Sequence, residues 1–147
     1  MHLLLFESYR TENFIMTEHN LGDVRYSINH DKRIIYAERH DTLNKQGVYA
    51  EWSAVQQLDG FDPAYDTIVD YSFVPRVDLS AAELYELNKE MPSHDVRTSN
   101  IAIVTDLDEG RHMLARFFCT IVNLVSRRKH NVFHTKTEAE LWIKSLR

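Results

Sequence analysis

Three acidic residues, Asp106, Asp108 and Glu109, follow the apolar run at residues 101–105, a position where carboxylates could do chemistry. Side chains at the carboxyl end of a parallel strand are well placed to hold a ligand or a Mg²⁺ ion. The competing interpretation is electrostatic, because Asp108 and Glu109 would stabilise the positive first turn of the next helix. We favour the electrostatic interpretation and keep a magnesium-dependent hydrolase as the third hypothesis for function.

An apolar strand that ends in Asp106-Leu-Asp108 also resembles the nucleophile motif of the haloacid-dehalogenase phosphatases. That resemblance implies phosphoryl transfer through Asp106. The motif lies late in the chain, however, and no later lysine and acidic pair occupies the strand ends that such a site needs. We therefore expect no catalytic residue and predict that the protein is not an enzyme.

Histidine and cysteine give no metal or nucleophile site. The chain has eight histidines, but His130 and His134 flank one short strand, where four residues span roughly 13 Å, too far to share an ion. Cys119 is the only cysteine and lies within an apolar helix, where a buried structural thiol is the expected role. No metal and no cofactor are expected.

Charge and composition narrow the class of protein. The chain has 147 residues, a net charge of −5 and 44% hydrophobic residues, as is usual for a globular protein. Its one basic cluster, at 127–130, would stabilise the C-terminal end of a helix or contact an acidic partner or a lipid head group. A nucleic-acid binder would show a basic excess. No apolar run approaches the roughly 18 residues of a membrane span, and residues 1–6 are too short for a signal-peptide core. We expect a cytoplasmic protein that is not integral to a membrane.

The elements that must position these residues follow from the apolar spacing. Strands are predicted at residues 24–29, 33–38, 67–74, 100–105 and 132–134. Helices are predicted at residues 48–58, 81–91, 109–128 and 138–146, the last beginning with the capping box Thr137-Glu-Ala-Glu140. The order β-β-α-β-α-β-α-β-α predicts an α/β fold with a mixed, mostly parallel sheet, an N-terminal β-hairpin and flanking helices. We expect one domain at 23–147, preceded by an N-terminal extension at 1–22.

The segment Ile68-Val-Asp70-Tyr-Ser-Phe-Val-Pro-Arg-Val-Asp78-Leu-Ser80-Ala resembles the central motif of STAS domains, the SpoIIAA-like fold of anti-sigma-factor antagonists. In that family a strand ends at an aspartate, and an Asp-Ser-Ser/Thr-Gly motif eight residues later opens a helix. Ser80 falls on the family's phosphorylation site, whereas Leu79 and Ala81 depart from its motif. The resemblance implies docking of a protein partner around Pro75, Arg76, Asp78, Leu79 and Ser80.

The second half of the chain resembles the STAS/CRAL-TRIO-like group of small bacterial proteins. The matching residues are Ala102–Asp106, Gly110–Phe118, Val132-Phe133 and Glu138–Trp142. CRAL-TRIO relatives bind lipids, so the resemblance also implies a small apolar ligand.

Ser80 has a structural interpretation that does not depend on any family. Ser80-Ala-Ala-Glu83 is a capping box, in which the hydroxyl accepts a free backbone N–H of the first helical turn. The same helix terminus would favour a phosphoryl group, but Glu83 would repel it. We favour the cap and keep the phosphoacceptor as an alternative.

The long helix carries two apolar stripes, where packing on a sheet needs only one. They are Met113, Phe117, Thr120, Ile121 and Leu124, and Leu114, Phe118, Val122 and Val125. Three explanations remain open: packing against the last helix, a homodimer patch, or a ligand pocket bounded by Met113, Phe117, Phe118 and Trp142.

The first hypothesis for function is thus a non-catalytic regulatory or protein-interaction module of the STAS type. The alternative is a carrier or sensor of a small apolar or lipid-like molecule.

Overall fold

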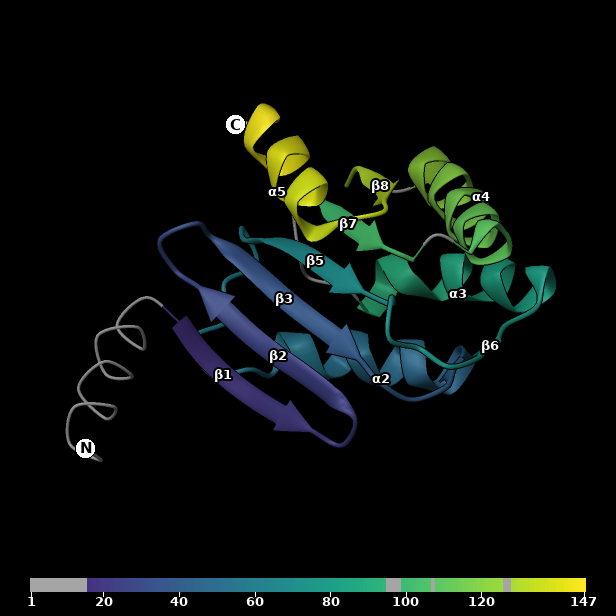
Figure 1. The fold of residues 1–147 in the computed structure, drawn as a ribbon, viewed down its shortest axis with the longest axis horizontal. Helices are drawn as coiled ribbons and strands as arrows, with labels where there is room; N and C mark the ends of the chain where they lie inside the picture. Colours follow the sequence, from purple (N-terminus) through teal and green to yellow (C-terminus); the bar gives the residue numbers. More distant parts are fainter. Residues whose placement is uncertain (1–15, 95–98, 107, 126–127) are drawn as a thin grey trace.

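The backbone is organised around a six-stranded sheet (Figure 1). The computed structural model describes residues 16–94, 99–106, 108–125 and 128–147. The strands, in their order across the sheet, are β1 (Met16–Leu21), β2 (Val24–Asn29), β3 (Ile34–Arg39), β5 (Asp66–Asp70), β7 (Ile101–Val104) and β8 (His130–Phe133). The first three pair antiparallel, and β3, β5, β7 and β8 run parallel. The predicted α/β class, with a mixed and mostly parallel sheet, is confirmed.

The hairpin of β2 and β3 forms where alternation predicts it. Its turn is held by the Asn29 side chain, whose Oδ1 accepts a hydrogen bond from the backbone N–H of Lys32 at 2.9 Å. Strand β1, which we did not predict, pairs along the whole length of β2. The sheet therefore reaches into the segment 1–22 that we set apart as an extension.

Helices cover both faces of the sheet. On one face lie α2 (Lys45–Gln56), α3 (Ala81–His94) and α4 (Glu109–Val125), and on the other lies α5 (Lys136–Ser145) (Figure 1). Alternate residues of one strand serve the two layers: Ile103 packs with α4, whereas Ala102 and Val104 pack with α5. The predicted continuation of the long helix to Arg128 crosses residues 126 and 127, which lie outside the described residues.

Several predicted element boundaries were wrong, and for two of them the structure shows the residue that sets the true boundary. β5 ends at Asp70 rather than at residue 74, because the Asp70 carboxylate accepts the N–H of Ser72 at 2.9 Å and the chain turns there. A two-residue strand β6 (Val77–Asp78) then pairs parallel with β4 (Leu43–Asn44). The last helix is capped by Thr135, whose Oγ1 accepts the N–H of Glu138 at 3.2 Å, and not by the predicted Thr137.

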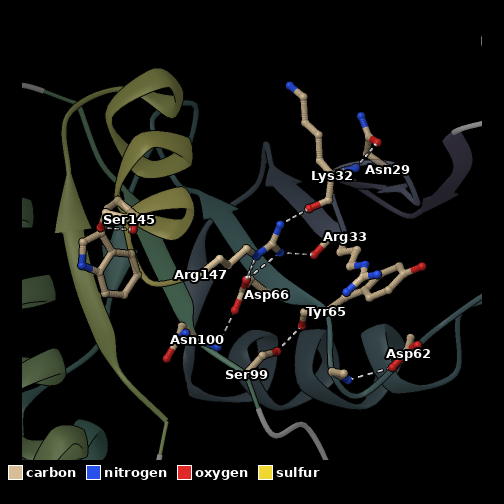
Figure 2. A network of polar contacts seen from close by, with 12 residues as sticks. Asn29, Lys32, Arg33, Asp62, Tyr65, Asp66, Ser99, Asn100, Ser145 and Arg147 are labelled. Atoms are coloured by element: carbon tan, nitrogen blue, oxygen red, sulfur yellow. Dashed lines mark hydrogen bonds and ion pairs between the residues drawn. The ribbon is translucent and has the colours of Figure 1, made fainter.

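A polar network ties the amino ends of the parallel strands together (Figure 2). Arg147, which follows α5, donates from Nη2 to Oδ2 of the buried Asp66 at 2.7 Å and to the carbonyl of Arg33 at 2.9 Å. The other oxygen of Asp66 accepts the N–H of Asn100 at 2.8 Å. This network fixes the starts of β5 and β7 and involves only the amino ends of the strands.

Candidate functional site

A cavity of about 80 Å³ lies between the sheet and helices α2, α3 and α4. Its wall is mostly apolar and comes from all three helices and from the sheet, with Trp52, Val55, Val69, Leu84, Leu114 and Phe118 among its residues. Two small residues, Ala37 of β3 and Ala115 of α4, also line it. Larger side chains at these two positions would fill the space.

An unfilled space of this size lowers stability. Enclosed cavities in protein cores cost about 24 cal/mol per Å³, so about 2 kcal/mol is the upper limit for this partly open one. That is a sizeable fraction of the roughly 5–15 kcal/mol by which domains are stable. A mostly apolar cavity with a few convergent polar groups is the usual form of a small-molecule site.

The polar end of the cavity lies at the carboxyl ends of the strands and contains a buried ion pair. Glu51 of α2 and Arg39, the last residue of β3, are 3% and 5% exposed. Arg39 Nε donates to Glu51 Oε1 at 2.6 Å, and the Tyr71 hydroxyl donates to Oε2 at 2.7 Å. Arg39 also donates to Asp41 and to the carbonyl of Gly47. Glu51 and Tyr71 both line the cavity.

The protonation of this group follows from burial and from its partners. Burial raises the pKa of Glu51, and the Arg39 guanidinium and the Tyr71 hydrogen bond oppose the rise. Burial, followed by the neighbouring Glu51 carboxylate, raises the pKa of Tyr71 well above its ordinary value. Tyr71 therefore stays a hydrogen-bond donor.

Arg111, in the first turn of α4, holds the other side of the polar end. Its guanidinium donates to the carbonyl of Val74 and, at 3.0 Å, to that of Pro75, and Nη1 lies 3.7 Å from Asp106 Oδ2. Arg111 thereby fixes the chain between β5 and β6. Val77 and Leu79 of the following segment turn inward and line the cavity.

The predicted partner-binding residues lie on this same segment. Pro75, Arg76, Asp78 and Ser80 are exposed, while Leu79 is half-buried against the cavity. The capping box at Ser80 is confirmed: Ser80 Oγ accepts the N–H of Glu83 at 3.1 Å, and the N–H of Ser80 donates to Glu83 Oε1 at 3.0 Å.

The structure does not bring the four residues of the predicted apolar patch together. Phe118 lines the cavity, whereas Met113 and Phe117 are 71% and 45% exposed on α4. Trp142 packs against Phe133 on the opposite face of the sheet, with ring centroids 5.5 Å apart. Packing of α4 against the last helix is excluded as well, since α4 and α5 lie on opposite faces of the sheet.

The acidic residues after β7 organise the start of α4. Asp108 Oδ1 accepts the N–H of Arg111 at 3.0 Å, as the electrostatic interpretation predicts, and Asp106 Oδ1 accepts the N–H of Asp108 at 3.2 Å. Beside them, His112 stacks on His134 with ring centroids 4.2 Å apart. Burial, then His134, then Arg116 lower the pKa of His112.

The described residues give little support for a metal site or a reactive thiol. Within the residues that the structure describes, no three histidine, cysteine or acidic side chains gather as metal ligands. Burial raises the pKa of Cys119 to about 12. In the predicted basic cluster, Arg127 lies outside the described residues, Arg128 donates from Nε to the carbonyl of Ser99 at 2.5 Å, and Lys129 is exposed.

The sequence reasoning missed Arg39, Glu51, Tyr71 and Arg111. Glu51 carried a signal, because it lies three residues after Val48 and one before Trp52, within the apolar stripe of its helix. A carboxylate on a buried stripe requires a buried partner. Nothing in the sequence identifies Arg39, across a loop, as that partner.

Comparisons with known proteins find a structural likeness but no match to a family model or a curated protein. The fold is similar to the crystal structure of an uncharacterised DUF3478-family protein from Shewanella loihica, described as having a SpoIIAA-like fold. The sequences are 15% identical, the match covers 87% of this chain and 91% of that chain, and the TM-score is 0.46.

The described part of the chain also contains no helix with the length and apolar character of a membrane span.

Proposed function

We propose that the protein is a non-catalytic sensor, which binds a small, mainly apolar molecule in the cavity and presents the segment 75–80 to a protein partner. One observation carries the proposal. Val77 and Leu79 line the cavity, while their neighbours Arg76, Asp78 and Ser80 are exposed. A molecule in the cavity therefore contacts the same short segment that forms the surface.

The residues that could be catalytic already have structural roles, and this favours binding over catalysis. Asp106 and Asp108 hold the start of α4, and the Cys119 thiol is buried with a raised pKa. Ser80 exchanges two hydrogen bonds with Glu83, and a phosphoryl group on the Ser80 hydroxyl would meet the Glu83 carboxylate. Phosphorylation of Ser80 stays a prediction that stands apart from the proposal.

Fluorescence of Trp52 tests the binding. The chain has two tryptophans, Trp52 in the cavity wall and Trp142 on the other face of the sheet, so Trp142→Phe leaves one reporter at the site. Titration of this variant with cyclopentane, an apolar probe, should give a saturable change. Trp52→Phe, which keeps only Trp142, is the matched control and should show none. An unsaturable drift of equal size in both variants would contradict the proposal.

A second candidate is self-association through α4. Met113, Phe117 and Leu124, spaced on one stripe of α4, are all exposed, and Leu124 is 82% exposed. Such a stripe is typical of a helix that packs on another helix. Sedimentation of the wild type and of Phe117→Glu tests this candidate, which requires a dimer that the variant loses.

A further inference from the structure

The carboxylate of Glu51 has acceptor capacity left over at the cavity. An ionised carboxylate can accept about four hydrogen bonds. Arg39 Nε uses one position on Oε1, and the Tyr71 hydroxyl uses one on Oε2. Glu51 is 3% exposed and lines the cavity, so a molecule bound there lies beside this carboxylate.

The charged groups of the cavity wall already have partners of opposite sign. Glu51 pairs with Arg39, and Arg111 lies 3.7 Å from the Asp106 carboxylate. An added anion would meet the Glu51 carboxylate, and an added cation would lose its hydration without an unpaired charge to meet. The wall therefore favours a neutral molecule.

The size of the cavity limits the molecule to a few atoms. A cavity of about 150 Å³ lined by apolar side chains holds benzene, with six carbon atoms. By proportion, a space of about 80 Å³ holds roughly three non-hydrogen atoms, and because the cavity is partly open a molecule of about five can extend beyond it. Apolar residues such as Val55, Val69 and Leu114 would surround the hydrocarbon part.

From these three observations we infer that the ligand is a small neutral aliphatic alcohol, whose hydroxyl donates a hydrogen bond to Glu51. The inference rests on the proposed function and names the chemical class of its ligand. Hydrogen bonds to charged acceptors are stronger than those between neutral groups, so the donor should improve affinity about 10-fold or more.

Two isomeric ligands separate the effect of the hydroxyl on affinity from the effects of size and composition. 1-Butanol and diethyl ether contain the same atoms, but the ether has no hydrogen to donate. Both are titrated into the Trp142→Phe variant, with Trp52 as the reporter. Ala115→Leu, which fills the cavity, serves as the control for effects of the solvent itself. We expect 1-butanol to bind about 10-fold more tightly than diethyl ether, and equal affinities would overturn the inference.

Variants of the polar end test the role of Glu51. Glu51→Gln removes the charge, so the preference for the alcohol should shrink to a few-fold; an unchanged preference would overturn the assignment to Glu51. Should this variant fail to fold, Tyr71→Phe, which leaves the carboxylate in place, should retain the preference. If Tyr71→Phe loses the preference for the alcohol, the hydrogen-bond partner of the alcohol is Tyr71 instead of Glu51. If neither isomer nor cyclopentane saturates, the proposed function itself fails.

Discussion

Replacement of Ala115 by leucine should stabilise the protein, although core substitutions usually do the opposite. Ala115 lies on α4 with its side chain at the cavity wall. Leucine adds three carbon atoms, each worth about 0.8 kcal/mol when buried, for an upper limit of about 2.4 kcal/mol. The cost of the cavity itself has an upper limit of about 2 kcal/mol. Since leucine and alanine are both good helix formers, we expect a net gain of about 1–2 kcal/mol after some strain.

Urea unfolding followed by circular dichroism measures this gain. With a typical denaturant slope of about 2 kcal/mol per molar, the midpoint should rise by roughly 0.5–1 M at an unchanged slope. Ala50→Leu makes the same change on the exposed side of α2 and should stay within about 0.5 kcal/mol of the wild type.

The reasoning is refuted if the cavity has no room for a larger side chain. A loss of stability in Ala115→Leu could reflect strain at that one position, so Val69→Ile provides a second, smaller filling from the sheet side. It adds one carbon atom and should gain up to about 0.8 kcal/mol. Loss of stability in both variants would show that the wall is already close-packed.

The remaining predictions concern buried polar groups and the thiol. Arg39→Met should cost about 3–5 kcal/mol in urea unfolding because it leaves Glu51 buried without its cation, and adding Glu51→Leu should recover most of that loss; no recovery would argue against the pair. Asn88 is 3% exposed, and among the described residues its amide has no hydrogen-bond partner, so Asn88→Leu should raise stability by about 1 kcal/mol, whereas a lower Tm would mean that the amide is satisfied. Cys119 should resist a thiol reagent in the folded protein and react after unfolding in urea; rapid reaction in the folded state would contradict its burial. The pKa of His112 is lowered below 6.5, so the unfolded chain binds the proton first and stability should fall on acidification below that value. His112→Gln should show a smaller loss between about pH 7.5 and about pH 5.5, and an equal loss would assign the effect elsewhere.

The sheet and helices could be predicted because their signals are local. The alternation at 24–29 and the helical spacing of Val48, Trp52 and Val55 each lie within one element. The capping box at Ser80 needs only residues three apart. Strand β1 escaped because residues 16–21, read as Met-Thr-Glu-His-Asn-Leu, have no apolar alternation and pair only because β2 offers an open edge.

The site could not be predicted because it depends on how distant elements pack. Phe118 and Trp142 were grouped together from their apolar character alone. The edge strand β8 connects the two helices: α4 precedes β8 and packs on one face of the sheet, and α5 follows β8 and packs on the other. The cavity likewise arises from the spacing of three helices over the sheet, a distance that no single segment encodes.

Crystals of the protein under xenon pressure test the central claim most directly. Xenon enters dry apolar cavities and needs no polar anchor. The account predicts an ordered xenon atom between the sheet and helices α2, α3 and α4, in contact with Trp52, Val69 and Leu114, and its absence from crystals of Ala115→Leu. Crystals of the wild type with no xenon at this position, or with xenon only elsewhere, would contradict the claim that the cavity receives a small molecule.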